Sequence, residues 1–243
     1  MRIIFIISNI SCFFSFTNLV SAQNSLNLSS EFGETQASFG NTIKMAVDFQ
    51  YDLGNFNIKT GLQADIKDYL YNTLSAYTAQ ISHSLKINRF NFNANVFYLH
   101  SAKGQLFNEY NYGFSFSSLN TAHFDWEFGT HFRIISPSRY GVNTFQLSRN
   151  SVYENWNFIY VIKYRLKPVQ NCWNLSFCMT NRDLFYINQE TNPYCYLGST
   201  FRISSRLSSF TEVWYKPAGM SNFRVNYFGY LIRTGIKWNL SKL

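Results

Sequence analysis

Charge and long apolar runs are both scarce in this sequence, and the combination excludes two common classes of protein. Charged residues make up 14% of the 243 residues, whereas soluble globular domains carry about 25%. After residue 16, no stretch approaches the ~18 consecutive apolar residues of a membrane-spanning helix. Aromatic residues nevertheless reach 19%. The chain therefore resembles neither an ordinary soluble domain nor a helical membrane protein.

Cysteine is also scarce, and its spacing indicates no metal or redox site. Beyond the N-terminal segment only Cys172, Cys178 and Cys195 are present, without the Cys-x-x-Cys spacing of zinc ligands. A disulfide from Cys195 to either of the other two stays open, because they flank one loop. We expect free thiols in structural positions, and we predict no metal ion and no cofactor.

The formal net charge is +8, but a basic patch is missing. Basic residues occur singly along the chain, whereas nucleic-acid-binding proteins gather them on one face or along one helix. We therefore predict no nucleic-acid partner.

The first 22 residues predict an export signal. Arg2 supplies a positive start, residues 3–16 are mostly apolar, and Val20-Ser21-Ala22 offers small residues for cleavage before Gln23. The apolar run is too short and too often interrupted by polar residues to remain as an anchor. We expect residues 1–22 to be removed and residues 23–243 to form one β-barrel domain.

An apolar and polar alternation with a period of two runs through most of the remaining chain. Between Ile43 and Leu53, for example, every second residue is large and apolar or aromatic, and a second alternating run follows the turn Gly54-Asn55. Alternation over such lengths predicts strands with one apolar face, and a two-residue turn joins them into a hairpin.

The pattern predicts about twelve strands, with ten or fourteen as alternatives. The count depends on assigning Phe145 and Leu147 to a long loop between Ser136 and Asn155. Short turns and longer loops alternate along the chain. That asymmetry and an even strand number are typical of an up-and-down barrel in a bacterial outer membrane.

Two arrangements of the alternating faces are open. In a soluble β-sandwich or lipocalin-like barrel the apolar face points inward and charge covers the outside. In a transmembrane barrel the apolar face meets lipid and the polar face lines the interior, which gives a bland average hydropathy. The mean hydropathy of −0.17 and the shortage of charge favour the second arrangement: all-β, a single closed antiparallel transmembrane barrel.

The C-terminal segment carries a family resemblance. Its alternating apolar residues are Phe228, Tyr230, Ile232, Ile236, Trp238 and Leu240. The segment resembles the last strand of Gram-negative outer-membrane β-barrel proteins, although three further residues follow Leu240 where the usual form ends on an aromatic residue. The resemblance implies contact with outer-membrane lipid, insertion by the barrel-assembly machinery and localisation in the outer membrane.

The predicted inward faces carry most of the charge. Basic residues predicted to line the lumen are Lys163, Arg165, Arg182, Arg202, Arg206, Arg233 and Lys237. Acidic residues and histidines predicted to line it are Asp48, Asp65, His123, Asp125, Glu127 and His131. If these groups pair, they plug the barrel with ion pairs; if the basic surplus faces water, it favours anions. The sequence leaves both outcomes open.

Enzymatic chemistry has little support. His123, Asp125 and Glu127 share one face, as metal ligands would, but a salt-bridged lumen explains them equally well. His83 and His100 have serine neighbours, yet neither forms an evident Ser-His-Asp arrangement of a lipid hydrolase, and no Gly-x-Ser-x-Gly turn occurs. We predict no catalytic residues.

The sequence favours a small passive channel with a positively biased lumen and small anions as solutes. The alternative is a non-conducting barrel that serves other envelope proteins as a scaffold, with the loops Ser136–Asn155 and Asp183–Pro193 as contact surfaces. Loops of this length usually have a function.

Overall fold

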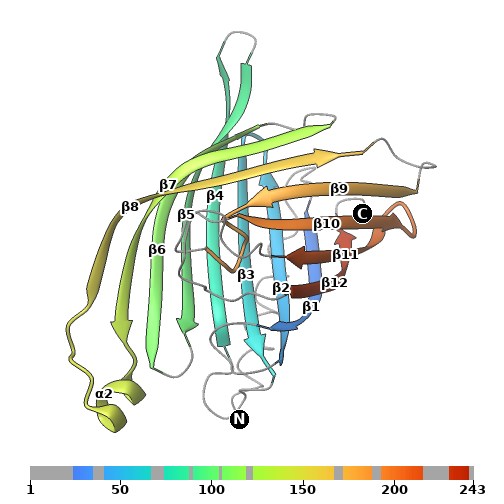
Figure 1. Cartoon of the computed structure of the whole chain (residues 1–243). Helices are drawn as coiled ribbons and strands as arrows, with labels where there is room; N and C mark the ends of the chain where they lie inside the picture. Colours follow the sequence, from blue (N-terminus) through green and yellow to red (C-terminus); the bar gives the residue numbers. More distant parts are fainter. Residues whose placement is uncertain are drawn as a thin grey trace.

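The computed structural model is a closed antiparallel β-barrel of twelve strands (Figure 1). It describes residues 24–34, 41–66, 74–87, 90–103, 106–118, 123–166, 172–187, 193–215 and 230–240. The predicted export signal lies outside the described residues. Each strand pairs with its neighbours in sequence, and the strand order is that of an up-and-down barrel.

The strands differ in length around the barrel. Their bounds are β1 Ser25–Glu34, β2 Asn41–Leu53, β3 Phe56–Asp65, β4 Leu74–Ile87, β5 Phe90–Lys103, β6 Phe107–Ser118, β7 Phe124–Pro137, β8 Val152–Arg165, β9 Trp173–Thr180, β10 Tyr194–Arg202, β11 Leu207–Tyr215 and β12 Tyr230–Asn239. Among β4 to β8 each strand has 12 to 14 residues, whereas β9 to β12 have 8 to 10.

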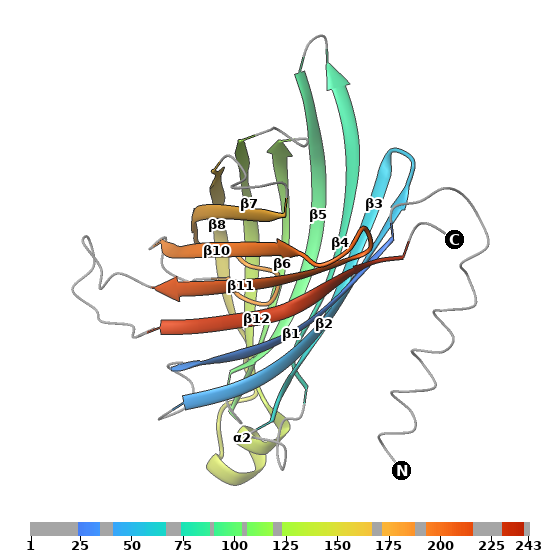
Figure 2. The same cartoon turned by 90° about the vertical axis from the view of Figure 1, so that its right-hand side faces the viewer.

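Pairing of β1 with β12 closes the barrel, with Ser25 opposite Asn239 and Glu31 opposite Arg233. The predicted twelve strands are confirmed. Phe145 belongs to a short helix, α2 (Arg139–Phe145), which lies at one end of the barrel beyond β7 and β8 (Figure 2).

The irregular stretch expected from Ser136 to Asn155 is shorter in the structure. Strand β7 continues through Pro137, and β8 begins at Val152. Between them, Ser138 caps α2 by accepting a hydrogen bond from the Gly141 amide at 2.9 Å. Cross-strand pairing of β7 and β8 therefore extends further than the local residue pattern indicated.

The alternation predicted from the sequence sets the two faces of the wall. On β12, Ile232, Ile236 and Trp238 are exposed on the outside, whereas Leu231 and Arg233 are buried inside. The same split recurs around the barrel. An apolar outer face and a polar inner face are what a membrane-embedded barrel requires.

The remaining expectations about cysteine and helices are settled within the described residues. Cys172, Cys178 and Cys195 are free thiols. Because Cys178 pairs with Tyr196 in the sheet register, Cys195 lies on the opposite face from it, which prevents a disulfide between them. No helix in the described ranges is both long and apolar enough to cross a membrane.

Candidate functional site: the barrel lumen

A segment between β9 and β10 folds into the barrel. Residues Asn181–Ile187 turn inward after β9, and Arg182 forms an antiparallel bridge with Ile187. The Asp183 amide donates to the Tyr186 carbonyl at 2.7 Å, which closes the tight turn. The expectation that Asp183–Pro193 is an outward contact surface is wrong for Asp183–Ile187; residues 188–192 lie outside the described residues. We call Asn181–Ile187 the inner segment.

Two polar residues direct the chain inward where β9 ends. The Thr180 hydroxyl accepts from the Arg182 amide at 2.9 Å. The Asn181 side chain accepts from the Tyr160 amide and donates to the Phe158 carbonyl, both at 2.8 Å. Since β8 pairs with β9 only from Val161 to Arg165, Asn181 satisfies backbone groups of β8 just beyond that ladder.

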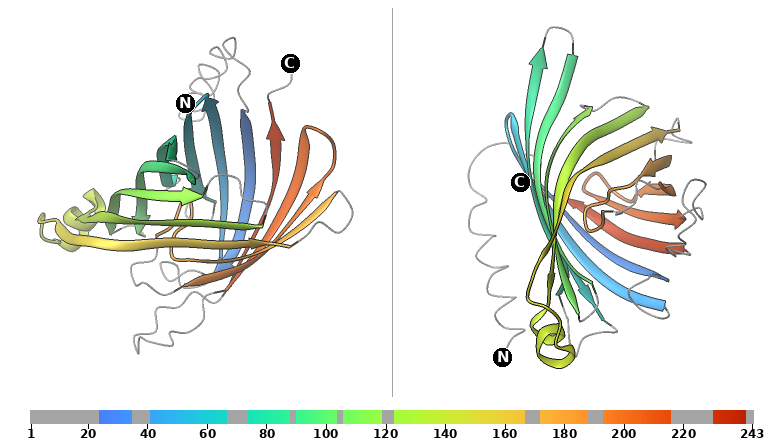
Figure 3. Two further views of the ribbon diagram at one scale, coloured as in Figure 1. Left: turned by 90° about the horizontal axis from the view of Figure 1, so that it is seen from above. Right: turned by 60° about the vertical axis from the view of Figure 1, so that its left-hand side comes forward.

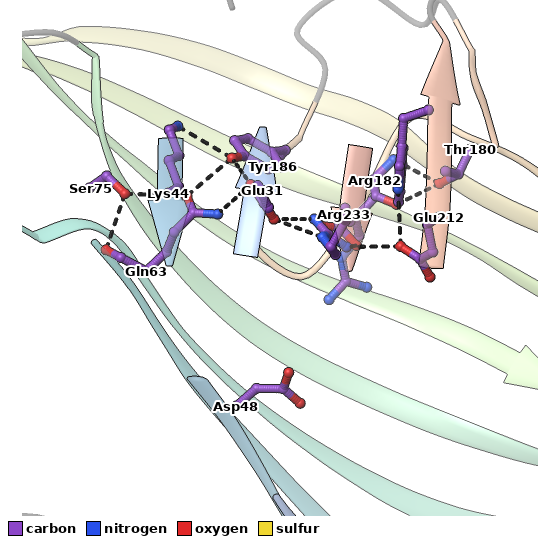
Figure 4. A network of polar contacts seen from close by, with 12 residues as sticks. Glu31, Lys44, Asp48, Gln63, Ser75, Thr180, Arg182, Tyr186, Glu212 and Arg233 are labelled. Carbon is purple, nitrogen blue, oxygen red and sulfur yellow. Dashed lines mark hydrogen bonds and ion pairs between the residues drawn. The ribbon is translucent and has the colours of Figure 1, made fainter. Parts of the chain in front are cut away.

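Arg233 on β12 is the main anchor of the inner segment. Its guanidinium lies 2.5 Å from Asp183, 2.7 Å from Glu31 and 3.3 Å from Glu212, and it sits 5.1 Å from the centre of the Trp214 ring. Figure 4 shows Arg233 with Glu31 and Glu212, together with Arg182 and Tyr186 of the inner segment. Burial pushes the pKa of Asp183 up, but the Arg233 charge and hydrogen bonds outweigh it and lower that pKa below 3.8. Asp183 is therefore an ionised partner of Arg233.

Tyr186 and Arg182 hold the inner segment to other parts of the wall. The Tyr186 hydroxyl donates to Glu31 at 2.6 Å and accepts from Lys44 at 3.3 Å; burial and the Glu31 carboxylate raise its pKa well above its ordinary value. Arg182 forms an ion pair with Glu127 on β7 and covers the Phe97 ring on β5 at 3.7 Å. The inner segment thus contacts strands from widely separated parts of the barrel wall.

Apolar contacts also hold the inner segment against the barrel wall. Phe185 and Ile187 are 3% and 4% exposed. They pack in a cluster with inward-facing residues of β2, β4, β5 and β8, which are Ala46, Ala76, Phe97, Leu99 and Ile159. Seen from above, the described part of the connection after β9 lies within the ring of strands (Figure 3). The inner segment therefore packs against the inner faces of four strands at this level.

A second group of charges lies closer to the short turns. Lys237 on β12 is within electrostatic range of Lys59, Lys163, Asp48 and Asp52. Lys59 is 3.8 Å from Asp48, and Asp48 accepts from Asn27 at 2.6 Å. In Figure 4, Asp48 lies apart from the network around Arg233. We call Asp48, Asp52, Lys59, Lys163 and Lys237 the turn-side cluster.

The other predicted lumen residues are distributed between the wall and the rim. Arg165 forms an ion pair with Asp125, while His123 is exposed. Arg202 and Arg206 are exposed beside the turn between β10 and β11.

Two further predicted lumen residues lie on β3 and β7. Asp65 is half-buried at the end of β3, opposite Lys44. His131 is 1% exposed and faces inward on β7.

The other sequence predictions can be placed only in part. Of the predicted insertion signal, Tyr230, Ile232, Ile236 and Trp238 line the outer face of β12 and Leu240 follows directly after it, while Phe228 lies outside the described residues. Across the described ranges no group of three or more His, Cys, Asp or Glu side chains is arranged to hold a metal ion.

The two histidines considered for hydrolysis lie among aromatic rings. His83 lies 4.4 Å from the Phe56 ring, and His100 lies 4.6 Å from the Tyr77 ring.

The sequence gives no site role to Glu31, Glu154 and Tyr186. Arg133 lies 2.9 Å from Glu109 and 2.8 Å from Glu154, and these three residues brace β6, β7 and β8. Glu31 and Tyr186 join the Arg233 network. Glu31 and Arg133 sit at inward positions of their strands, so alternation marks them; nothing in the local pattern marks Tyr186.

Comparisons with known proteins give a fold and no family. No family model and no curated protein matches the chain. The NanC porin has a similar structure, with a TM-score of 0.55 at 12% identity over 88% of this chain and 100% of that chain. The KdgM porin in complex with disordered oligogalacturonate gives 0.53 at 9% identity over 89% and 99%. The COG4313 outer-membrane channel from Pseudomonas putida F1 gives 0.53 at 6% identity over 90% and 96%. The chain has the fold of outer-membrane β-barrels.

Proposed function

We propose that this protein is a passive channel in the outer membrane of a Gram-negative bacterium, with small anions as preferred solutes. The observation that carries the proposal is a closed barrel with an apolar outside and a charged inside. Three structural neighbours, NanC, KdgM and the COG4313 protein, are porins or channels. An export signal in residues 1–22 and insertion by the barrel-assembly machinery would bring the chain to this membrane.

The turn-side cluster supports the preference for anions. The turn-side cluster holds three lysines, Lys59, Lys163 and Lys237, and two aspartates, Asp48 and Asp52. Asp125 lies opposite Lys163 in the sheet register and forms an ion pair with Arg165, and Arg202 and Arg206 add positive charge at the adjacent rim. Basic residues along a pore lower the energy of an anion relative to a cation. Oligogalacturonate, the ligand in the KdgM complex, is itself an anion, which is consistent with this solute class in the same fold.

Single-channel recording tests the proposal. Refolded protein, checked by the heat-modifiable shift of a folded barrel on a gel, is added to a planar bilayer with a potassium chloride gradient. Discrete steps with a reversal potential on the chloride side support an anion channel. Cation-selective steps contradict the solute preference but keep the channel.

A second function is favoured by one observation. The inner segment and the apolar cluster fill the lumen at one level, as expected of a non-conducting barrel that serves other envelope proteins as a scaffold. A folded barrel that stays silent in the bilayer, even when the inner segment is released, supports that function.

A further inference from the structure

We infer that the inner segment, Asn181–Ile187, is a movable gate that closes the lumen in this conformation and must leave its seat before solutes pass. The inference rests on the proposed channel function. The segment reaches Glu31 on β1, Glu127 on β7 and Arg233 on β12, so its side chains cross the lumen.

The polar side chains of the barrel wall keep other hydrogen-bond or ion-pair partners when the inner segment leaves its position. Without Asp183, Arg233 keeps Glu31 and Glu212 as partners. Without Arg182, Glu127 loses its ion pair, but its side chain is partly exposed and keeps the Ser115 hydroxyl, which donates to it at 2.5 Å. Without Tyr186, Glu31 keeps Gln63 at 2.9 Å as well as Arg233. If the segment were a permanent plug, its removal would be expected to leave buried charges of the wall unpaired, which is costly.

The segment itself is lightly constrained. At the start of the segment, the Asn181 amide donates to the Tyr160 carbonyl at 3.2 Å and the Arg182 amide donates to the Thr180 hydroxyl at 2.9 Å. Beyond these two residues the backbone forms one isolated bridge, between Arg182 and Ile187, and one turn contact, and no ladder joins residues 183–187 to a neighbouring strand in the described ranges. The side-chain contacts of Asp183, Phe185, Tyr186 and Ile187 hold this part in place. A segment fixed at one end and held by side chains beyond it can exchange between two discrete positions.

A substitution at Gly61 on β3 offers an independent way to displace the inner segment. A Cβ atom added there would lie 2.8 Å from Cζ of Phe185 and 2.9 Å from Cε1, closer than such atoms can approach. Gly61→Ala therefore pushes Phe185 away from the wall and keeps every charged group; the added atom also lies 3.2 Å from Cβ of Asp48, which must shift slightly. At Gly198 on β10 the same added atom meets the flexible Ser176 hydroxyl at 2.7 Å, so Gly198→Ala is the matched control.

The polar contacts of Asp183 and Tyr186 offer a second way to release the inner segment. The double variant Asp183→Asn with Tyr186→Phe removes two polar contacts of the segment and leaves the wall residues intact. Its control is Glu154→Gln, which removes a carboxylate from Arg133 and leaves the inner segment's ion pairs in place. Gly61→Ala acts sterically and the double variant removes polar contacts. The same result from both would therefore not be a side effect of one type of substitution.

The experiment measures step size and open fraction in planar bilayers for the wild type, both releasing variants and both controls, each confirmed as folded by the gel shift. We expect both releasing variants to raise conductance or open fraction at least threefold, and both controls to match the wild type.

Three results would overturn the gate. Releasing variants that conduct like a conducting wild type would leave the channel intact without a gate. Controls that open as much as the releasing variants would attribute the effect to general loosening. Folded proteins that are silent in all five forms would remove the channel function and the gate together.

Discussion

The half of the lumen nearest the long loops and the half nearest the short turns use charge differently. On the loop side, Arg233 is 8% exposed, Glu31 is 1% exposed, and both have several partners. On the turn side, the Lys59 side chain is 31% exposed and its nearest carboxylate is at 3.8 Å. Buried charge must be paired, whereas solvated charge need not be.

In the proposed channel, the difference separates two tasks. The charged groups of the loop-side half form ion pairs with one another, so they stabilise the barrel and hold the inner segment. The groups of the turn-side cluster face one another less completely, so their charge is available to passing ions. Stability and closure should therefore respond to mutations in the first half, and selectivity to mutations in the second.

The largest expected effect comes from removing the buried anchor. Arg233→Met leaves Glu31, Asp183 and Glu212 without their common cation, a loss of about 3–5 kcal/mol for a buried pair. Urea unfolding in detergent, followed by the gel shift, measures it. Lys237→Met, four residues along the same inward face, should cost less, because Lys237 is half-buried and has two lysines as well as two aspartates nearby. Equal losses at both positions would contradict the division into two halves.

The next effect concerns selectivity. Lys163→Glu with Lys237→Glu reverses two charges of the turn-side cluster, and we expect the chloride to potassium permeability ratio to fall several-fold. The reversal potential in a salt gradient measures it. Glutamine at both positions should give an intermediate ratio, and high salt should shrink the difference by screening. A ratio unaffected by the reversal would place the conduction path elsewhere.

A smaller effect is expected at the rim. Arg202 and Arg206 are exposed beside the turn between β10 and β11, where water screens them. Reversing both to Glu should lower anion preference by less than about twofold, because exposed charges interact weakly at a distance. The same reversal-potential measurement applies. An effect as large as that of the lysine pair would show that the rim, and not the turn-side cluster, selects ions.

The smallest effect is expected from mild acid. The pKa of Asp183 is lowered below 3.8 by Arg233, so its contribution to holding the gate is complete above that value and is lost only as pH falls through the lowered pKa. Open fraction should therefore stay constant from pH 7 to pH 5 and rise only in stronger acid. Opening between pH 7 and pH 5 would show that a group other than Asp183 controls the gate.

The strands were predictable because their cause is local. Alternation of side chains along one strand decides which residues face lipid, and Ile232 and Arg233 fall on opposite faces without reference to any other element. Phe145 was assigned to a connection and not to a strand, which gave the count of twelve. The structure agrees, because Phe145 lies in helix α2, outside the sheet. The ends of β7 and β8 were less predictable, since pairing between neighbours extends them.

The inner segment was not predictable, because its contacts lie far away in sequence. Tyr186 meets Glu31 across 155 positions, and Arg182 meets Gln80 across 102. A polar stretch after a strand has the same composition whether it folds outward into water or inward onto a charged wall. Only the closed barrel brings the partners within reach.

The alternation of the chain thus decided the fold class and the inward position of residues such as Glu31 and Arg233, because a period of two is a property of consecutive residues. The closure of β1 onto β12 decided which of those charges are neutralised. Arg233 and Glu31 are 202 positions apart and become neighbours only when the sheet closes on itself, and the same closure gives Asp183 its partner and the lumen its gate.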